Sequence, residues 1–166
     1  MSYCVIVRGP LGVGKSSVAR RLASLLSGKY VSIDTILEKH NLDKIDEKEG
    51  CIPVKNFLKA MEMELPKIMS GLAKGKVFVI DGNFYHKEQI ERLIRKLDAP
   101  HYVFTLKASL EVCLERDRKR EKAYGEISVK RVYDLVSRFD IGTVIDTKHK
   151  DLEQVVNDIL SYLPQS

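Results

Sequence analysis

The chain has 166 residues, of which 44% are hydrophobic and 31% charged, and it carries a formal net charge of +5. These values indicate one globular domain, spanning residues 1–166, that is large enough to bury its own core. No apolar run reaches the roughly 18 residues that a membrane span requires, so we expect a soluble, cytoplasmic protein without a signal peptide.

The positive charge and the cysteines do not by themselves indicate a partner. A basic protein can bind nucleic acid, but seven basic and only three acidic residues fall within 116–131, so most of the excess belongs to one segment. Cys4, Cys51 and Cys113 are far apart and form no C-x-x-C pair, and the four histidines show no metal-binding spacing. We therefore expect buried thiols in a reducing compartment.

The first predicted elements flank a phosphate-binding sequence. Residues 3–7 form a β-branched run typical of a buried strand, and apolar residues recur at helical spacing over 17–26. Between them the chain has the pattern G-x-x-x-x-G-K-S, which binds phosphate when a strand precedes it and a helix follows. The expected nucleotide-binding residues are Gly9, Pro10, Leu11, Gly12, Val13, Gly14, Lys15, Ser16 and Ser17.

Each residue type in this loop has a physical role. Glycines allow backbone angles that turn successive N–H groups onto phosphate oxygens, and the helix N-terminus adds a favourable dipole. Lys15 is expected to reach the β- and γ-phosphates, and the Ser16 hydroxyl is expected to ligate Mg²⁺. The sequence therefore predicts a site for a nucleoside triphosphate, with ATP and Mg²⁺ as the expected ligands.

Strand and helix patterns alternate through the rest of the chain. Further strands are predicted at 30–33, 76–81, 102–106 and 143–145, and helices over 35–41, 53–68, 90–97, 109–114, 129–139 and 152–163. Pro66 is expected to kink or divide its helix, and the strand at 76–81 is expected to be buried except for its final acid, Asp81. Apolar strands separated by helices predict a parallel sheet covered on both faces.

Some classes of phosphate-loop protein lack support in this sequence. A GTPase needs a D-x-x-G step, and no Asp here is followed by Gly three residues later. It also needs an N/T-K-x-D motif, but the chain has Lys at the last position of 147–150. AAA-type and helicase ATPases usually need a longer chain. Small kinases remain.

Four blocks resemble the kinase module of 5′-hydroxyl polynucleotide kinases and related small-substrate kinases. They are the phosphate loop, Ser32-Ile33-Asp34, Val79-Ile80-Asp81-Gly82-Asn83-Phe84, and the segment 113–120 with its R-x-x-x-R spacing. Residues 125–133 also resemble the segment that follows the lid of these kinases. Adenylylsulfate kinase and shikimate kinase share this plan, so the resemblance identifies a superfamily better than a substrate.

The resemblance implies a three-layer α/β P-loop kinase fold, similar to nucleoside-monophosphate kinases. It implies five parallel strands in the order 2-3-1-4-5 and a short lid at about 116–131. One departure concerns the acceptor: Asp34 is followed by Thr35-Ile36-Leu37, where polynucleotide kinases have further polar and basic residues. That difference argues against nucleic acid as the acceptor.

Two acids at strand ends are candidate site residues. Asp34 could accept a proton from an acceptor hydroxyl, or it could only cap the helix that begins at Thr35. Asp81 could hold Mg²⁺ through water, or it could be a turn residue in Asp81-Gly82-Asn83. Their position beyond strand ends, where ligands collect in an open α/β sheet, favours the functional interpretations.

Arg116 and Arg120 are four residues apart and are predicted to lie on one helical face. Guanidinium groups can stabilise charge on a transferring phosphoryl group, although most such runs are only solvated. Asp146 and Thr147 follow the last strand, where small kinases often contact adenine.

The sequence thus predicts a kinase that transfers the γ-phosphoryl group of ATP to a hydroxyl of a small molecule or, less in keeping with the residues after Asp34, of a nucleic acid. Lys15, Asp34, Arg116 and Arg120 are the candidate catalytic residues, and Ser16 and Asp81 are the candidate metal ligands. A nucleotide or nucleoside kinase remains an alternative, as does an ATP-binding regulatory module with little turnover. The residues that select the acceptor are expected within 42–75.

Overall fold

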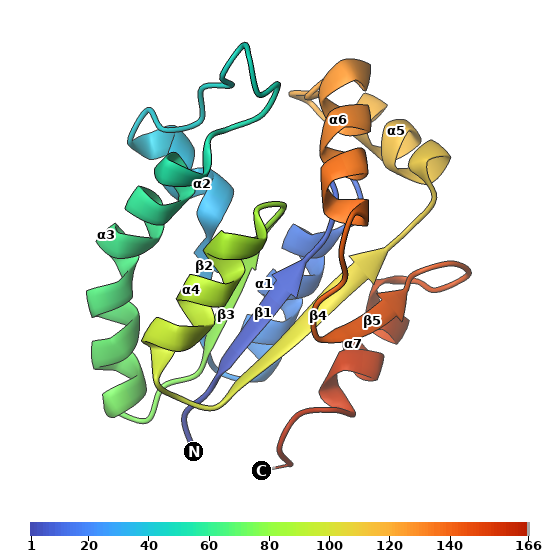
Figure 1. The fold of residues 1–166 in the computed structure, drawn as a ribbon. Coiled ribbons are helices and arrows are strands. Elements are labelled where there is room, and N and C mark those ends of the chain that lie inside the picture. The colour runs from blue at the N-terminus through green and yellow to red at the C-terminus, as the bar shows by residue number, and fades with distance from the viewer. Residues whose placement is uncertain (166) are drawn as a thin grey trace.

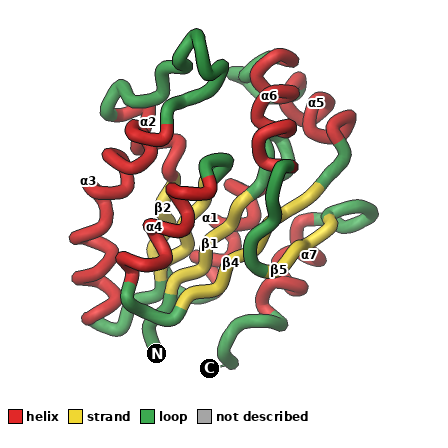
Figure 2. Tube along the Cα trace, in the orientation of Figure 1, coloured by secondary structure: helices red, strands yellow, loops and turns green. Residues whose placement is uncertain are grey.

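The computed structural model describes residues 1–165 and contains one parallel sheet of five strands (Figures 1 and 2). The order across the sheet is β2-β3-β1-β4-β5, which confirms the predicted topology. The strands are β1 (Cys4–Arg8), β2 (Lys29–Ser32), β3 (Phe78–Gly82), β4 (His101–Lys107) and β5 (Thr143–Asp146). The helices are α1 (Lys15–Leu25), α2 (Ile33–Lys39), α3 (Val54–Ala73), α4 (Lys87–Leu97), α5 (Leu110–Arg118), α6 (Glu126–Ser137) and α7 (Leu152–Leu160).

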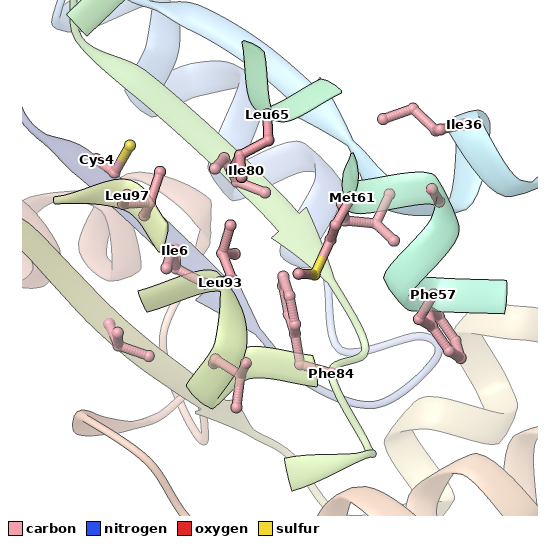
Figure 3. Packing of buried hydrophobic residues seen from close by; sticks show 14 of the residues in the cluster. Cys4, Ile6, Ile36, Phe57, Met61, Leu65, Ile80, Phe84, Leu93 and Leu97 are labelled. Carbon is pink, nitrogen blue, oxygen red and sulfur yellow. The ribbon is translucent and has the colours of Figure 1, made fainter. Parts of the chain in front are cut away.

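Side chains that alternate along the central strand supply two cores, one on each face of the sheet. Cys4 and Ile6 of β1 belong to the core that α3 and α4 cover, where Ile6 and Ile80 pack near Leu93 (Figure 3). Val5 and Val7 point the other way, into the core that α1 and α7 cover. Because all five strand residues of β1 are buried, the strand has no polar face, as expected for a sheet covered on both sides.

Two local expectations are wrong. Pro66 does not divide its helix: α3 is continuous over 20 residues, and Pro66 lies on an exposed part of it, where water can reach the carbonyl group that the missing N–H leaves free. Asp81 is not exposed at its strand end but fully buried. Both errors arise because neighbouring elements, which the linear pattern does not contain, decide exposure.

The carboxyl ends of all five strands lie at one edge of the sheet, since the strands are parallel. Above that edge rise α2, α5 and α6, together with the loop between α2 and α3 (Figure 1). This arrangement collects the phosphate loop, Asp34 and Asp81 at the same end of the molecule. Among the described residues, no helix is both long and apolar enough to cross a membrane.

Candidate functional site

The phosphate loop joins β1 to α1 in a conformation that depends on two glycines. Gly12 has φ 83° and Gly14, the N-cap of α1, has φ 100°, values that side chains strongly disfavour. A Cβ atom on Gly12 would also lie 2.4 Å from the carbonyl oxygen of Cys113 in α5. The loop therefore packs directly against the backbone of α5, and Lys15 is 6% exposed at the first residue of α1.

Arg116 lies on this loop, whereas Arg120 does not. Nη1 of Arg116 donates to the carbonyl oxygen of Val13 at 2.7 Å and to that of Gly12 at 3.4 Å. The guanidinium carbon of Arg120 instead lies 4.7 Å from the centroid of the Tyr124 ring. The two arginines therefore contact different parts of the protein, although they are only four residues apart in the chain.

The expectation that both arginines share a helical face is wrong because α5 ends at Arg118. The buried carboxylate of Asp117 accepts from the backbone N–H groups of Tyr124 and Gly125, both at 3.0 Å. These bonds fold the chain back on itself and start α6, for which Gly125 is the N-cap. Asp117 is a structural determinant that sequence reasoning missed, since its partners are seven and eight residues away.

Asp81 has the surroundings of a metal-binding carboxylate. Its Oδ2 accepts a hydrogen bond from the Tyr30 hydroxyl, whereas Oδ1 is buried and has no hydrogen-bond partner among the described residues. Burial raises the pKa of Asp81; hydrogen bonds from Tyr30 and Ser16 and the charge of Lys15 oppose that shift. An unpartnered carboxylate oxygen beside a serine hydroxyl suits Mg²⁺, which prefers oxygen ligands and retains several waters.

The hydroxyl of Tyr30 belongs to the same group. Burial and the hydrogen bond to Asp81 raise the pKa of Tyr30 to about 12, so the phenol stays protonated and keeps donating. Sequence reasoning gave Tyr30 no role beyond its strand. Its position could have been anticipated, because β2 and β3 are neighbours and Tyr30 is paired with Val79, two residues before Asp81.

Asp34 lies in the first turn of α2, half-buried, and it is not the helix cap. Ser32 is the N-cap, and its Oγ accepts from the backbone N–H of Thr35 at 3.2 Å. The alternative interpretation of Asp34 as a cap is therefore wrong. The charge of Asp34 acts to raise the pKa of Asp81 and also that of Tyr124, so its carboxylate lies near enough to affect both groups.

Two pockets meet at the phosphate loop. The larger, about 940 Å³, is lined by Pro10, by Arg116 and by the loops 107–109 and 146–151. The smaller, about 460 Å³, is lined by Leu11, by Asp34 and Asn83, and by residues of the loop before α3 and of α6. Adjacent residues of one loop thus line different pockets, and both volumes suit small ligands.

The larger pocket includes the segment that was expected to contact adenine. Thr147 is buried, and its Oγ1 donates to the carbonyl oxygen of Lys107 at 2.8 Å. This bond ties the loop after β5 to the end of β4. Asp146 and Thr147 therefore line a cavity that opens beside the phosphate loop.

A third residue that sequence reasoning missed is Arg8, which immediately precedes the phosphate loop. Its side chain is fully buried; Nε donates to the carbonyl oxygen of Phe84 at 3.1 Å, and Nη2 donates to that of Val136 at 2.9 Å. Burial lowers the pKa of Arg8 to about 10, so the group remains charged at neutral pH. Arg8 thereby joins β1 to α6 and to the loop after β3. No sequence pattern predicts a buried charge of this kind.

Known proteins were compared with this chain. A family model described as an AAA domain matches residues 4–140. A protein named "Putative adenylate kinase" from Pyrococcus furiosus is 29% identical over 168 residues, covering 96% of this chain and 83% of the relative. A shikimate kinase from Geobacter sulfurreducens is 26% identical over 170 residues, covering 96% and 90%.

The fold has a well-matched counterpart among solved structures. A sugar kinase from Janibacter sp. superposes with a TM-score of 0.80 at 16% identity, covering 98% of this chain and 94% of that one. The small-kinase fold and the phosphotransferase class are thus confirmed. The chain belongs to the family described as the AAA domain, whose model covers most of its length.

Proposed function

We propose that this protein transfers the γ-phosphoryl group of ATP to a hydroxyl of a small acceptor. The observation that carries the proposal is the pair of pockets beside the phosphate loop. Pro10 lines the larger pocket, and the adjacent Leu11 lines the smaller one. A phosphoryl transfer between two bound molecules requires such a division, with the reacting phosphate at the boundary. The larger pocket would hold the nucleoside of ATP and the smaller one the acceptor.

The chain's own residues divide the work of such a reaction. The loop amides and Lys15 would bind the β- and γ-phosphates, and Ser16 and Asp81 would hold Mg²⁺, which neutralises phosphate charge when bound. Asp34 lines the acceptor pocket and would orient the hydroxyl and take its proton. The acceptor oxygen then bonds to the γ-phosphorus as the bond to the β–γ bridging oxygen breaks, and ADP leaves with that oxygen.

Arg116 has a starting position that suits this role. Its bonds to the carbonyl oxygens of Gly12 and Val13 hold it at the loop, and we propose that it turns from them to a bound γ-phosphate. Arg120 would reach the site only if the lid segment at about 116–131 moved from its contact with Tyr124. We therefore propose that Arg120 joins the site on closure and that Arg116 is present throughout.

The test is an acceptor screen with γ-labelled ATP and Mg²⁺, with acceptor-dependent ADP formation as the readout. Lys15→Ala should abolish transfer, whereas Lys29→Ala, an exposed lysine on the edge strand β2, should leave it unchanged. Tight ATP binding without transfer to any acceptor would overturn the proposal and favour a nucleotide-binding regulatory module. Transfer that survives in Lys15→Ala would overturn the assignment of the phosphate loop.

A further inference from the structure

We infer that the acceptor is a hydroxyl compound that has an apolar body and carries no anionic group. The inference rests on the proposed function, because it identifies the smaller pocket as the acceptor site. Its content comes from the charges, the hydrogen-bonding atoms and the exposed apolar side chains of that pocket.

The charges that line the smaller pocket disfavour an anion. Three carboxylates line it, those of Asp34, Glu38 and Asp43, and among the described lining residues one, Arg131, is basic. Arg131 is already engaged: its Nη2 donates to the carbonyl oxygen of Glu49 at 2.7 Å, and its Nη1 lies 3.6 Å from Asp134. Binding a phosphate or carboxylate here would place like charges together without a free cation to offset them.

Arg120 is an additional cation beside this pocket, since it stacks on Tyr124, which lines it. One guanidinium at the rim balances one of the three carboxylates. In the proposed reaction it is also directed to the transferring phosphate. In this arrangement the three carboxylates of the lining therefore outnumber Arg131 and Arg120.

The unpartnered polar atom in the pocket is also suited to a hydroxyl. Oδ1 of Asn83 is buried and has no hydrogen-bond partner within the described part of the chain, and Asn83 lines the pocket. A buried oxygen without a partner costs free energy unless a ligand donates to it. Hydroxyl and ammonium groups donate, whereas ionised phosphate and carboxylate groups only accept.

Three apolar side chains are left exposed around the opening. Ile45 is 56% exposed, Tyr124 39% and Ile127 87%, and all three line the pocket. Ile45 comes from the loop before α3, and the other two come from the segment around the start of α6 that faces this loop (Figure 1). An apolar acceptor body would bury these side chains when the two segments close over it, and the removal of apolar surface from water would favour binding.

The test measures binding and transfer for matched pairs of alcohols that differ in one anionic group. Suitable pairs are adenosine with AMP, methyl shikimate with shikimate, pantothenol with pantothenate, and methyl 3-phenyllactate with 3-phenyllactate. Calorimetry in the presence of Mg²⁺ and a non-hydrolysable ATP analogue gives the dissociation constants, and ADP release gives turnover. We expect at least one non-anionic member to bind, and each that binds to do so at least about tenfold more tightly than its anionic partner.

The outcomes separate this inference from the proposed function. Phosphorylation of an anionic member in preference to its neutral partner would overturn the inference and leave the kinase proposal intact. Preferential binding of non-anionic members without any ADP release would support the inference and overturn the kinase proposal. A protein that binds ATP but no member of any pair would contradict the inference.

A charge reversal tests the physical cause. Glu38 lies in the last turn of α2, where a cation interacts favourably with the helix dipole, so Glu38→Lys should fold. It should shift selectivity toward the anionic members by about threefold or more, with the shift reduced by salt. Glu47→Lys adds the same charge in the exposed loop outside the pocket lining and should leave selectivity unchanged. Equal shifts in both variants would show a general charge effect and overturn the assignment to this pocket.

Discussion

Asp34→Asn separates acceptor chemistry from helix stability. Because Ser32 caps α2, the substitution removes no cap bond. It removes a charge from the first helical turn, which should lower the free energy of unfolding by about 0.3–1 kcal/mol. If Asp34 takes the proton of the acceptor hydroxyl, kcat should fall by about 10²–10⁴, equivalent to about 2.7–5.5 kcal/mol in the barrier. The kinetic effect therefore exceeds any plausible loss of stability.

The assay combines steady-state kinetics, ATP binding and chemical unfolding of the same variant. ATP affinity should be unchanged, and Mg²⁺ binding should not weaken, because removing the charge of Asp34 lowers the pKa of Asp81. Ser32→Ala is the matched control: it should lose about 1 kcal/mol of stability through the cap but keep kcat within a few-fold. A kcat for Asp34→Asn within threefold of wild type would refute the reasoning. Joint loss of ATP binding and transfer would instead move Asp34 to the metal site.

Four further substitutions, with one control, probe the rest of the structure. Arg116→Ala should lower kcat by about 10³ or more, and it should also loosen α5 from the phosphate loop and so speed the amide exchange of that loop. Arg120→Ala should lower kcat but leave the amide exchange of the loop unchanged. Equal exchange rates in both variants would contradict the contact of Arg116 to Val13. Asp81→Asn should abolish Mg²⁺-dependent turnover without lowering the Tm of the nucleotide-free protein. In the wild type, burial raises the folded-state pKa of Asp81. The ionised carboxylate therefore opposes folding as pH rises from the unfolded-state pKa of about 3.9 through the folded-state pKa. The free energy of unfolding of wild type minus that of Asp81→Asn should decrease across that window. Arg8→Ala should cost about 2–4 kcal/mol in chemical unfolding, because the carbonyl oxygens of Phe84 and Val136 lose their donor, whereas the exposed Arg21→Ala should cost at most about 1 kcal/mol.

The local part of this protein could be deduced from the sequence. The phosphate loop, the alternation of strands and helices and the parallel sheet follow from short-range patterns, because glycine angles and the spacing of apolar residues act within a few positions. The strand order was implied by resemblance and is confirmed. The residues that select the acceptor were expected within 42–75. That range supplies only part of the lining of the smaller pocket, since the phosphate loop, α2, the loop after β3 and the segment around the start of α6 contribute the rest.

What the tertiary structure decided is which groups meet. Asp81 is buried against Tyr30 because β2 and β3 are neighbours. This burial leaves its Oδ1 atom without a hydrogen-bond partner among the described residues. Arg116 and Arg120 separate because Asp117 ends α5 through backbone groups that lie beyond it. The bond from Arg8 to Val136 joins positions 128 residues apart in the chain, and each pocket likewise collects side chains from distant segments. Such pairings depend on the summed packing of whole elements, which sequence spacing does not encode, whereas the chemistry of the phosphate loop lies within eight consecutive residues.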